Sequence, residues 1–361
     1  MKKLLSLVLA AVMLLSVCAF ASAEDMKVAM ITDYGDIIDQ SFNQTTYEAC
    51  QAWTDANGVE FTYFKPAGDS TAERVRMVEA AVDEGYNVLV LPGFAFGETI
   101  AETQNDYPDV TFIALDVSEF DVGGVVNPNV FCAVYQEELS GYMAGYAAVK
   151  LGYKQLGFLG GMAVPAVTRF GYGFVQGADA AAAELGLTDV TIKYVYGNQF
   201  YGDADITAYM DTWYQNGMEV VFACGGGIYT SAAEAAAKVG GKVIGVDTDQ
   251  AGIIDAYGEG MTVTSAMKGL AATVNTLLDE TKAGNFANYG GKVLSLGLVS
   301  AEPTENYVQL AGSTQFAESF TEDDYKALVA AMFAGDVTVS NAIDAEPAVT
   351  AVSVDYQGNV K

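Results

Sequence analysis

Residues 26–44 read MKVAMITDYGDIIDQSFNQ, an apolar run that ends in a polar loop. The run 26–32 has the length and composition of a buried parallel strand. Three aspartates then interrupt it, and Ser41 is placed to cap a helix that begins near Phe42. The loop therefore leaves the carboxyl end of a strand, which is where open α/β sheets bind their ligands.

The side chains of this loop combine an aromatic ring with hydrogen-bonding groups. Phe42 and Asn43 stand close in sequence to Asp33 and Asp39. A flat apolar ring beside polar groups suits a planar, polar small molecule. An ordinary βα turn with a capping serine and a core phenylalanine explains the same residues, so both interpretations stay open here.

The first 23 residues have the pattern of a secretory signal peptide. Two lysines precede an apolar core at 4–17, and Ala21-Ser22-Ala23 resembles a cleavage site before Glu24. Cys18 offers a second interpretation, a lipid-modified cysteine, although bulky Val17 precedes it. We expect an exported protein, in the periplasm or on the outer face of the cytoplasmic membrane, reaching the membrane only through a partner or a lipid on Cys18.

Charge and length limit the function classes. Loss of the signal would remove two lysines and no acid, which takes the net charge from −29 to −31. Such an acidic surface repels nucleic acid and anionic lipid. The 361 residues allow two domains, and no further apolar run is long enough to cross a bilayer.

Histidine is absent, which excludes Ser-His-Asp and Cys-His catalytic units and His-ligated zinc. Cys50, Cys132 and Cys224 are widely spaced beside apolar or small residues, so we expect buried thiols. We expect no catalytic residue, no metal and no cofactor.

Strand and helix patterns alternate along the chain in two successive series, with a break near Tyr135. Repeated βα units predict parallel sheets with right-handed crossovers, and two series of similar composition predict two lobes. Gly141 and Gly145, four residues apart in a predicted helix at 136–150, predict close helix packing. The main predicted strands are 26–32, 59–65, 87–91 and 110–115 in the first series, and 154–160, 190–196, 219–223 and 242–246 in the second.

Further polar residues fall where predicted strands end. Aspartates there can accept hydrogen bonds from vicinal hydroxyls and a lysine can donate to one, which is a common way to hold a ribose or hexose. Glycines before a helix can present backbone N–H groups to a ligand, although a tight turn explains them equally well. The residues concerned are Asp116, Gly225, Asp247, Asp249 and Lys268, with Phe170 and Phe200 as further rings beside Phe42.

The stretch 33–50, DYGDIIDQSFNQTTYEAC, resembles the signature of the basic membrane protein (BMP) family of ABC transporter substrate-binding proteins, which includes purine nucleoside receptors. Gln40 stands where that signature usually has lysine. The resemblance continues in order through most of 26–282, in the segments GGMAVPAVTRFGYGFVQGADAA (160–181), VVFACGGG (220–227), VIGVDTDQ (243–250) and TSAMK (264–268).

The resemblance implies an α/β protein with the type I periplasmic-binding-protein fold, in which two Rossmann-like lobes with parallel sheets are joined by a three-crossover hinge. We expect an N-terminal lobe at 24–134 plus about 265–300, and a C-terminal lobe at 135–264 plus about 301–361. The tail after about Pro303 is outside the resemblance.

The resemblance also implies roles for individual residues. Phe42 and a second ring, matched to Phe200 with Phe170 as its rival, would enclose a base. Asp33 and Asn43 would read the base edge. Asp116, Asp247 and Lys268, with backbone near Gly225, would hold the ribose.

We therefore expect a monomeric solute-binding protein that closes on a purine nucleoside in the cleft between its lobes and delivers it to the permease of an ABC importer. Two alternatives remain. One is a sugar or autoinducer receptor of the same fold, and the other is an exported hydrolase that uses carboxylates such as Asp33 and Asp116.

Overall fold

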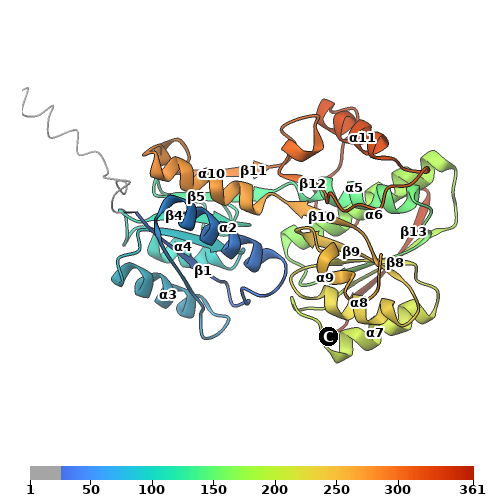
Figure 1. Cartoon of the computed structure of the whole chain (residues 1–361), viewed down its shortest axis with the longest axis horizontal. Coiled ribbons are helices and arrows are strands. Elements are labelled where there is room, and N and C mark those ends of the chain that lie inside the picture. The colour runs from blue at the N-terminus through green and yellow to red at the C-terminus, as the bar shows by residue number, and fades with distance from the viewer. Residues whose placement is uncertain (1–25) are drawn as a thin grey trace, which may run out of the picture. The chain divides into compact units, whose positions relative to one another are not determined.

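The computed structural model describes residues 26–361, so the predicted signal peptide at 1–23 and Cys18 lie outside the described residues. This part of the chain divides into two compact units. Unit 1 contains residues 26–34, 49–132 and 273–293, and unit 2 contains 35–48, 133–272 and 294–361. Each unit is built on one β-sheet (Figure 1).

Unit 1 is organised around a six-stranded sheet of order β11-β5-β4-β3-β1-β2. Strand β1 pairs in parallel with β2 and β3, and β3 pairs in parallel with β4. The strands β1, β3 and β4 are apolar and almost wholly buried, as expected of strands covered on both faces. The elements are β1 Lys27–Ile31, β2 Glu60–Phe64, β3 Val88–Pro92, β4 Thr111–Leu115, β5 Val130–Tyr135 and β11 Lys292–Leu296, with helices α2 Phe42–Asn57, α3 Thr71–Asp83, α4 Phe96–Thr103, α10 Leu270–Lys282 and η1 Phe286–Asn288.

Unit 2 is organised around a seven-stranded sheet of order β12-β10-β9-β8-β6-β7-β13. All neighbouring strands run parallel except β12, which pairs antiparallel with β10. The strands are β6 Gln155–Gly160, β7 Val190–Tyr196, β8 Val220–Cys224, β9 Lys242–Asp247, β10 Thr262–Lys268, β12 Val308–Leu310 and β13 Val352–Asn359. The helices are α5 Glu137–Lys150, α6 Pro165–Leu185, α7 Ala204–Gln215, α8 Tyr229–Ala237, α9 Ala251–Ile254, α11 Glu322–Ala334 and η2 Pro303–Glu305.

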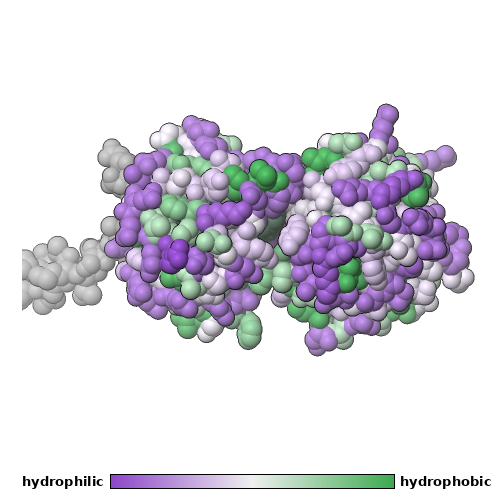
Figure 2. Space-filling model, turned by 90° about the horizontal axis from the view of Figure 1, so that it is seen from below, coloured by the Kyte–Doolittle hydropathy of each residue, from purple (hydrophilic) through white to green (hydrophobic). Residues whose placement is uncertain are grey.

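Helices cover both faces of the unit 2 sheet. Figure 1 shows helices beside the strands of this sheet. Along β8, Val220 and Phe222 face the core formed with α5, α6 and α11, whereas Val221 and Ala223 face the core formed with α7, α8 and α9. This alternation is the two-residue period of a strand. Hydrophilic residues make up much of the outer surface of the unit in the view of Figure 2.

Helices α5 and α6 pack with their backbones almost in contact. A Cβ atom added to Gly141 or Gly145 would lie 2.2 or 2.0 Å from the carbonyl oxygens of Phe170 and Phe174 on α6. Glycines of α6 meet α5 in the same way, since a Cβ on Gly177 would lie 2.0 Å from the Tyr142 carbonyl oxygen. The close packing predicted from Gly141 and Gly145 is confirmed.

The chain passes between the units three times, within β5, within α10 and within β11, apart from the excursion of residues 35–48. The compact units differ from the predicted lobes at several boundaries. Segment 35–48 groups with unit 2, and so do residues 133–134, 265–272 and 294–300. Strand β10 belongs to unit 2 because it pairs with β9 in the unit 2 sheet.

Most predicted elements are present, and the differences have local causes. Helix α6 begins at Pro165, because proline is favoured in the first turn of a helix. Thr321 caps α11 through a reciprocal capping box with Asp324. The tail, which was predicted to belong to the C-terminal lobe, supplies α11 and both edge strands of the unit 2 sheet, β12 and β13.

Candidate functional site

Unusual backbone conformations mark the loops that follow the strands. Within residues 26–361, the non-glycine residues with positive φ are Gln40 (56°), Asp116 (59°), Asn198 (60°) and Asp247 (65°). Each lies at or after the carboxyl end of a strand. Such conformations are strained by about 1–3 kcal/mol and concentrate at functional sites. They therefore point, independently of sequence resemblance, to the strand ends where ligand residues were predicted.

Asp39 organises the start of helix α2. Its carboxylate accepts hydrogen bonds from the backbone N–H groups of Ser41, Asn43 and Gln44 at 2.9, 3.0 and 3.0 Å. Burial raises the pKa of Asp39 above its ordinary value, while these hydrogen bonds act in the opposite direction. The expected cap, Ser41, is used differently, because its hydroxyl donates to Asp247 Oδ2 at 2.6 Å.

Asp247 and Gln250 connect the end of strand β9 to segment 35–48 within unit 2. Asp247 is 5% exposed and accepts the Ser41 hydroxyl hydrogen bond. The side-chain amide of Gln250 donates to the Gln40 carbonyl oxygen at 3.0 Å and accepts from the Val246 N–H at 2.9 Å. The strained residues 40 and 247 are thus held in place by one buried network, and Gln250 is a member that sequence reasoning missed.

Lys268, at the end of β10, lies next to the ring of Phe42. Its ammonium nitrogen is 5.1 Å from the ring centroid, within the range of a cation–π contact. The sequence grouped Lys268 with Asp247 and Asp249 as polar residues at strand ends, and the structure adds a carboxylate that was not predicted. Glu137 Oε1 lies 3.2 Å from the ammonium, a charge contact whose geometry falls short of a hydrogen bond.

The three predicted rings differ in burial. Phe42 and Phe200 are half-buried. Phe170 is 2% exposed and packs edge-on against Phe222 in the unit 2 core. Phe170 is therefore a core residue, and the assignment of Phe200 as the second ring stays a prediction.

Glycines make room for the Phe200 ring. A Cβ on Gly161 or Gly225 would lie 2.4 or 2.8 Å from Phe200 Cδ1. Gly225 also has a φ of 137°, which side-chain-bearing residues rarely adopt. Gly225 is thus required by the packing of Phe200, and its predicted backbone contact with a ligand stays a prediction.

Two other predicted residues have structural partners nearby. Asn43 is buried, and its side-chain nitrogen lies 3.4 Å from Asp39 Oδ2. Asp249 is exposed and accepts hydrogen bonds from the Ser313 hydroxyl at 2.6 Å and the Ala251 N–H at 3.1 Å. Asp249 therefore fastens a surface turn, in contrast to buried Asp247.

In unit 1, Asp33 and Asp116 lie at neighbouring strand ends. Asp33 follows β1 and is buried, and a Cβ on Gly93 at the end of β3 would lie 3.1 Å from Asp33 Oδ2. Asp116 follows β4 and is half-buried. The strands β4, β3 and β1 are neighbours in the sheet and run parallel, so both carboxylates lie at the carboxyl end of the unit 1 sheet.

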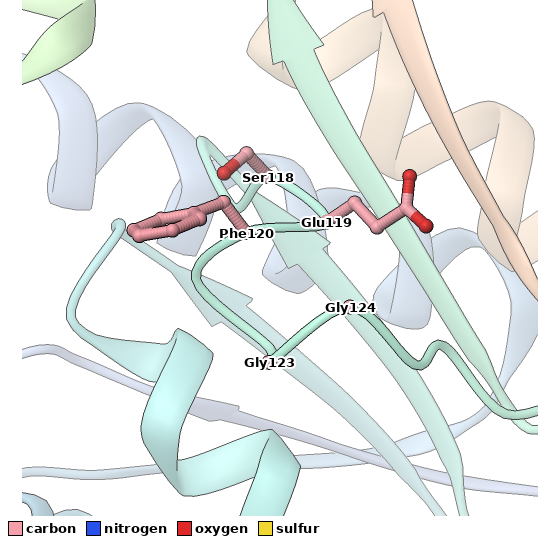
Figure 3. A pocket seen from close by; sticks show the side chains of 5 residues that line it. All are labelled: Ser118, Glu119, Phe120, Gly123 and Gly124. Atoms are coloured by element: carbon pink, nitrogen blue, oxygen red, sulfur yellow. The ribbon is translucent and has the colours of Figure 1, made fainter.

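The loop after Asp116 carries an exposed ring that the sequence did not indicate. Phe120 is 91% exposed, and Asp121 holds its loop by accepting from the Ser118 N–H and hydroxyl at 2.8 and 2.7 Å. Figure 3 shows Phe120 and Glu119 pointing to opposite sides of the loop. A wide hollow of about 620 Å³ is lined by Ser118, Glu119, Phe120, Gly123 and Gly124. It contains none of the predicted ligand residues.

Over residues 26–361, no group of three or more cysteine, aspartate or glutamate side chains is arranged to hold a metal ion. Nor does any helix in this range combine the length and apolar character needed to span a bilayer. Cys50, Cys132 and Cys224 are buried, as predicted.

Comparison with known proteins gives concordant results. Residues 26–311 match the sequence model of the Bmp family, described as "ABC transporter substrate-binding protein PnrA-like". The ABC transporter nucleoside-binding protein BmpA of Lactococcus lactis is 30% identical over 76% of this chain and 79% of its own length.

Solved structures show the same architecture. An ABC transporter solute-binding protein from Aeropyrum pernix has a TM-score of 0.68 at 21% identity, covering 87% of each chain. One from Conexibacter woesei has the same TM-score and identity over 88% of this chain and 99% of its own. These likenesses confirm the predicted two-lobed type I periplasmic-binding fold.

Proposed function

Because the chain belongs to the PnrA-like (Bmp) family of ABC transporter substrate-binding proteins, we propose that it binds a purine nucleoside and delivers it to the permease of an ABC importer. The match to the family model confirms the resemblance that was recognised in residues 33–50. Its members bind solutes for transport, so the chain is a solute-binding protein and not an enzyme, and the hydrolase alternative is set aside.

The observation that carries the nucleoside proposal is the grouping of a half-buried ring, a cation and a carboxylate in unit 2. Phe42 lies beside the Lys268 ammonium, and the hydroxyl of the neighbouring residue Ser41 donates a hydrogen bond to Asp247. A base stacked on Phe42 would place its attached sugar near groups that bind hydroxyls. Phe200 is proposed to cover the other face of the base, and Asn43 to read its edge.

The Lactococcus lactis relative, whose name describes it as nucleoside-binding, supports a nucleoside over a free sugar. Asp33 and Asp116 of unit 1 stay predicted ligand residues. We further propose that the protein is exported and monomeric, and that ligand binding favours a closed form that the permease recognises. Only a difference in affinity between the open and closed forms can drive such a change.

A thermal-shift screen of the chain from Glu24 onward tests the proposal. A ligand that binds only the folded state stabilises it by RT ln(1 + [L]/Kd), so the melting temperature rises as the ligand concentration exceeds Kd. We expect adenosine, guanosine or inosine to raise it, and free pentoses and hexoses to leave it unchanged. A rise with sugars alone would refute the nucleoside proposal and favour the sugar receptor.

Asp247→Asn tests the ribose contact separately. Asparagine tolerates positive φ, so the variant keeps the loop while it removes the charge. Loss of a charged hydrogen bond should weaken nucleoside binding by about 10- to 100-fold and hardly affect the free base. The control is Asp189→Asn. Asp189 precedes the amino end of β7, whereas Asp247 lies at the carboxyl end of β9. Equal losses for nucleoside and base would remove the ribose role of Asp247.

A further inference from the structure

A buried carboxylate in unit 2 lies between two cations that come from different elements. Glu137, the first residue of α5, has a side chain that is 0% exposed. Its Oε2 accepts a hydrogen bond from Arg169 Nε of α6 at 2.5 Å, and its Oε1 lies 3.2 Å from Lys268 Nζ at the end of β10. Figure 1 shows that these elements lie together in the unit.

Aromatic rings surround the Lys268 ammonium. Its nitrogen is 5.1, 5.5 and 5.4 Å from the ring centroids of Phe42, Tyr135 and Phe170. The lysine side chain is 3% exposed. The rings attract the ammonium group but do not hold it at one place. A carboxylate that is itself held by a second cation draws the ammonium to a defined position.

Stability alone gives little reason for such a cluster. Ion pairs removed from water lose much of their attraction to desolvation, and apolar replacements are often equally stable. A mobile lysine side chain, in contrast, loses rotamer entropy when a ligand orders it. A lysine that is already ordered avoids that loss on binding.

We propose that Glu137, itself fixed by Arg169, is the positioning residue that holds the Lys268 ammonium beside Phe42 for contact with the hydroxyl groups of the ligand. This inference rests on the proposed function. Glu137 acts through Lys268 and contacts no ligand atom. A ligand stacked on Phe42 then meets a cation whose position is already set by α5 and α6.

The test is a double-mutant cycle measured by calorimetry. Adenosine, guanosine and inosine, each with its free base, are titrated into wild type, Glu137→Gln, Lys268→Met and the double variant. Glu137→Gln should weaken the nucleoside by about tenfold or more and the free base by less than about twofold. In the Lys268→Met background, Glu137→Gln should have no further effect.

The matched control is Glu138→Gln. Glu138 is the next residue of the same helix and is 4% exposed, and its Oε2 is buried without a hydrogen-bond partner. Its replacement should leave the ratio of nucleoside to base affinity unchanged. Glu137→Gln and Lys268→Met effects that simply add would overturn the proposal, as would equal losses for nucleoside and base.

A second variant covers the case in which Glu137→Gln does not fold. Arg169→Gln leaves Glu137 beside Lys268 but frees the carboxylate, so it should give a smaller loss that also disappears in Lys268→Met. Persistence of that loss would contradict positioning. Failure of the wild-type chain to bind any nucleoside would instead refute the proposed function, and the two failures are therefore distinguishable.

Discussion

Phe42 and Phe170 are both aromatic residues near Lys268, yet their surroundings predict opposite consequences of substitution. Phe42→Ala should weaken nucleoside binding by about 10- to 100-fold, because a stacking ring contributes about 1–3 kcal/mol per base. It should hardly change the melting temperature, since the ring is only half-buried. Isothermal titration and thermal unfolding measure the two effects.

Phe170→Ala is the matched comparison. Removal of a fully buried ring costs about 3–5 kcal/mol of folding free energy, so this variant should unfold at a clearly lower temperature. Unchanged affinity in Phe42→Ala would mean that the nucleoside binds elsewhere. A strong loss of stability in that variant would mean that Phe42 is a core residue after all.

We expect the buried carboxyl of Glu138 to make the stability of the protein depend on pH. Burial raises the pKa of its carboxyl from the ordinary 4.5 to about 7, and the neighbouring Glu137 charge adds to the increase, while Arg169 opposes it. Between pH 4.5 and 7 the unfolded chain loses this proton and the folded chain keeps it. The free energy of unfolding therefore falls as pH rises through this window and stays lower above it.

Glu138→Gln should remove this dependence. Relative to wild type, the variant should gain up to about 3 kcal/mol between pH 5 and pH 8, measured by guanidinium unfolding at both values. Glu318→Gln, on the surface, is the control and should follow wild type. Parallel profiles for wild type and Glu138→Gln would show that Glu138 does not titrate in this range.

The sequence could indicate which residues stand at strand ends, but not all of their partners. Apolar runs followed by polar residues located Asp33, Phe42, Asp247 and Lys268, because the end of a strand is a local property of the chain. Glu137 was missed, because its contact with Lys268 is a tertiary contact between residues far apart in sequence. The only local signal was an acidic residue at the start of an otherwise apolar helix.

At the scale of elements, the close packing of α5 and α6 should make the stability of the protein very sensitive to a single added methyl group. Gly145→Ala would place a Cβ 2.0 Å from the Phe174 carbonyl oxygen, a backbone atom that cannot move alone. We expect a loss of at least about 3 kcal/mol in the free energy of unfolding, at the upper end of overpacking effects. Thermal and denaturant unfolding report it.

Gly252→Ala in α9 is the matched control, since a Cβ there meets nothing within 4 Å. Alanine should be neutral or stabilise by about 0.5 kcal/mol, because it is the better helix former. Similar small effects of both substitutions would mean that α5 and α6 are not in close contact in solution. The spacing of Gly141 and Gly145 predicted a close contact, but the sequence could not identify α6 as the partner.

At the scale of the whole molecule, the C-terminal strand β13 completes the unit 2 sheet, a role that the sequence did not predict. Strand β13 pairs with β7 along most of its length, and the Val360 N–H donates to the Tyr196 carbonyl oxygen at 2.8 Å. Removal of residues 352–361 should expose the β7 edge and lower the melting temperature. Hydrogen exchange should show lost protection in β7 and unchanged protection in β1, β3 and β4. Equal loss in both sheets would show that the units unfold together.

The order in which the strands are synthesised has a consequence for biogenesis. The unit 1 sheet is complete only when β11, at Lys292–Leu296, joins β5, and the unit 2 sheet only when β13, at Val352–Asn359, joins β7. A growing chain must therefore pass through β6 to β10 before the first sheet can close. Such distant pairing slows folding. If the chain is exported, as the sequence predicts, slow folding would favour an unfolded polypeptide that a secretion channel can still accept.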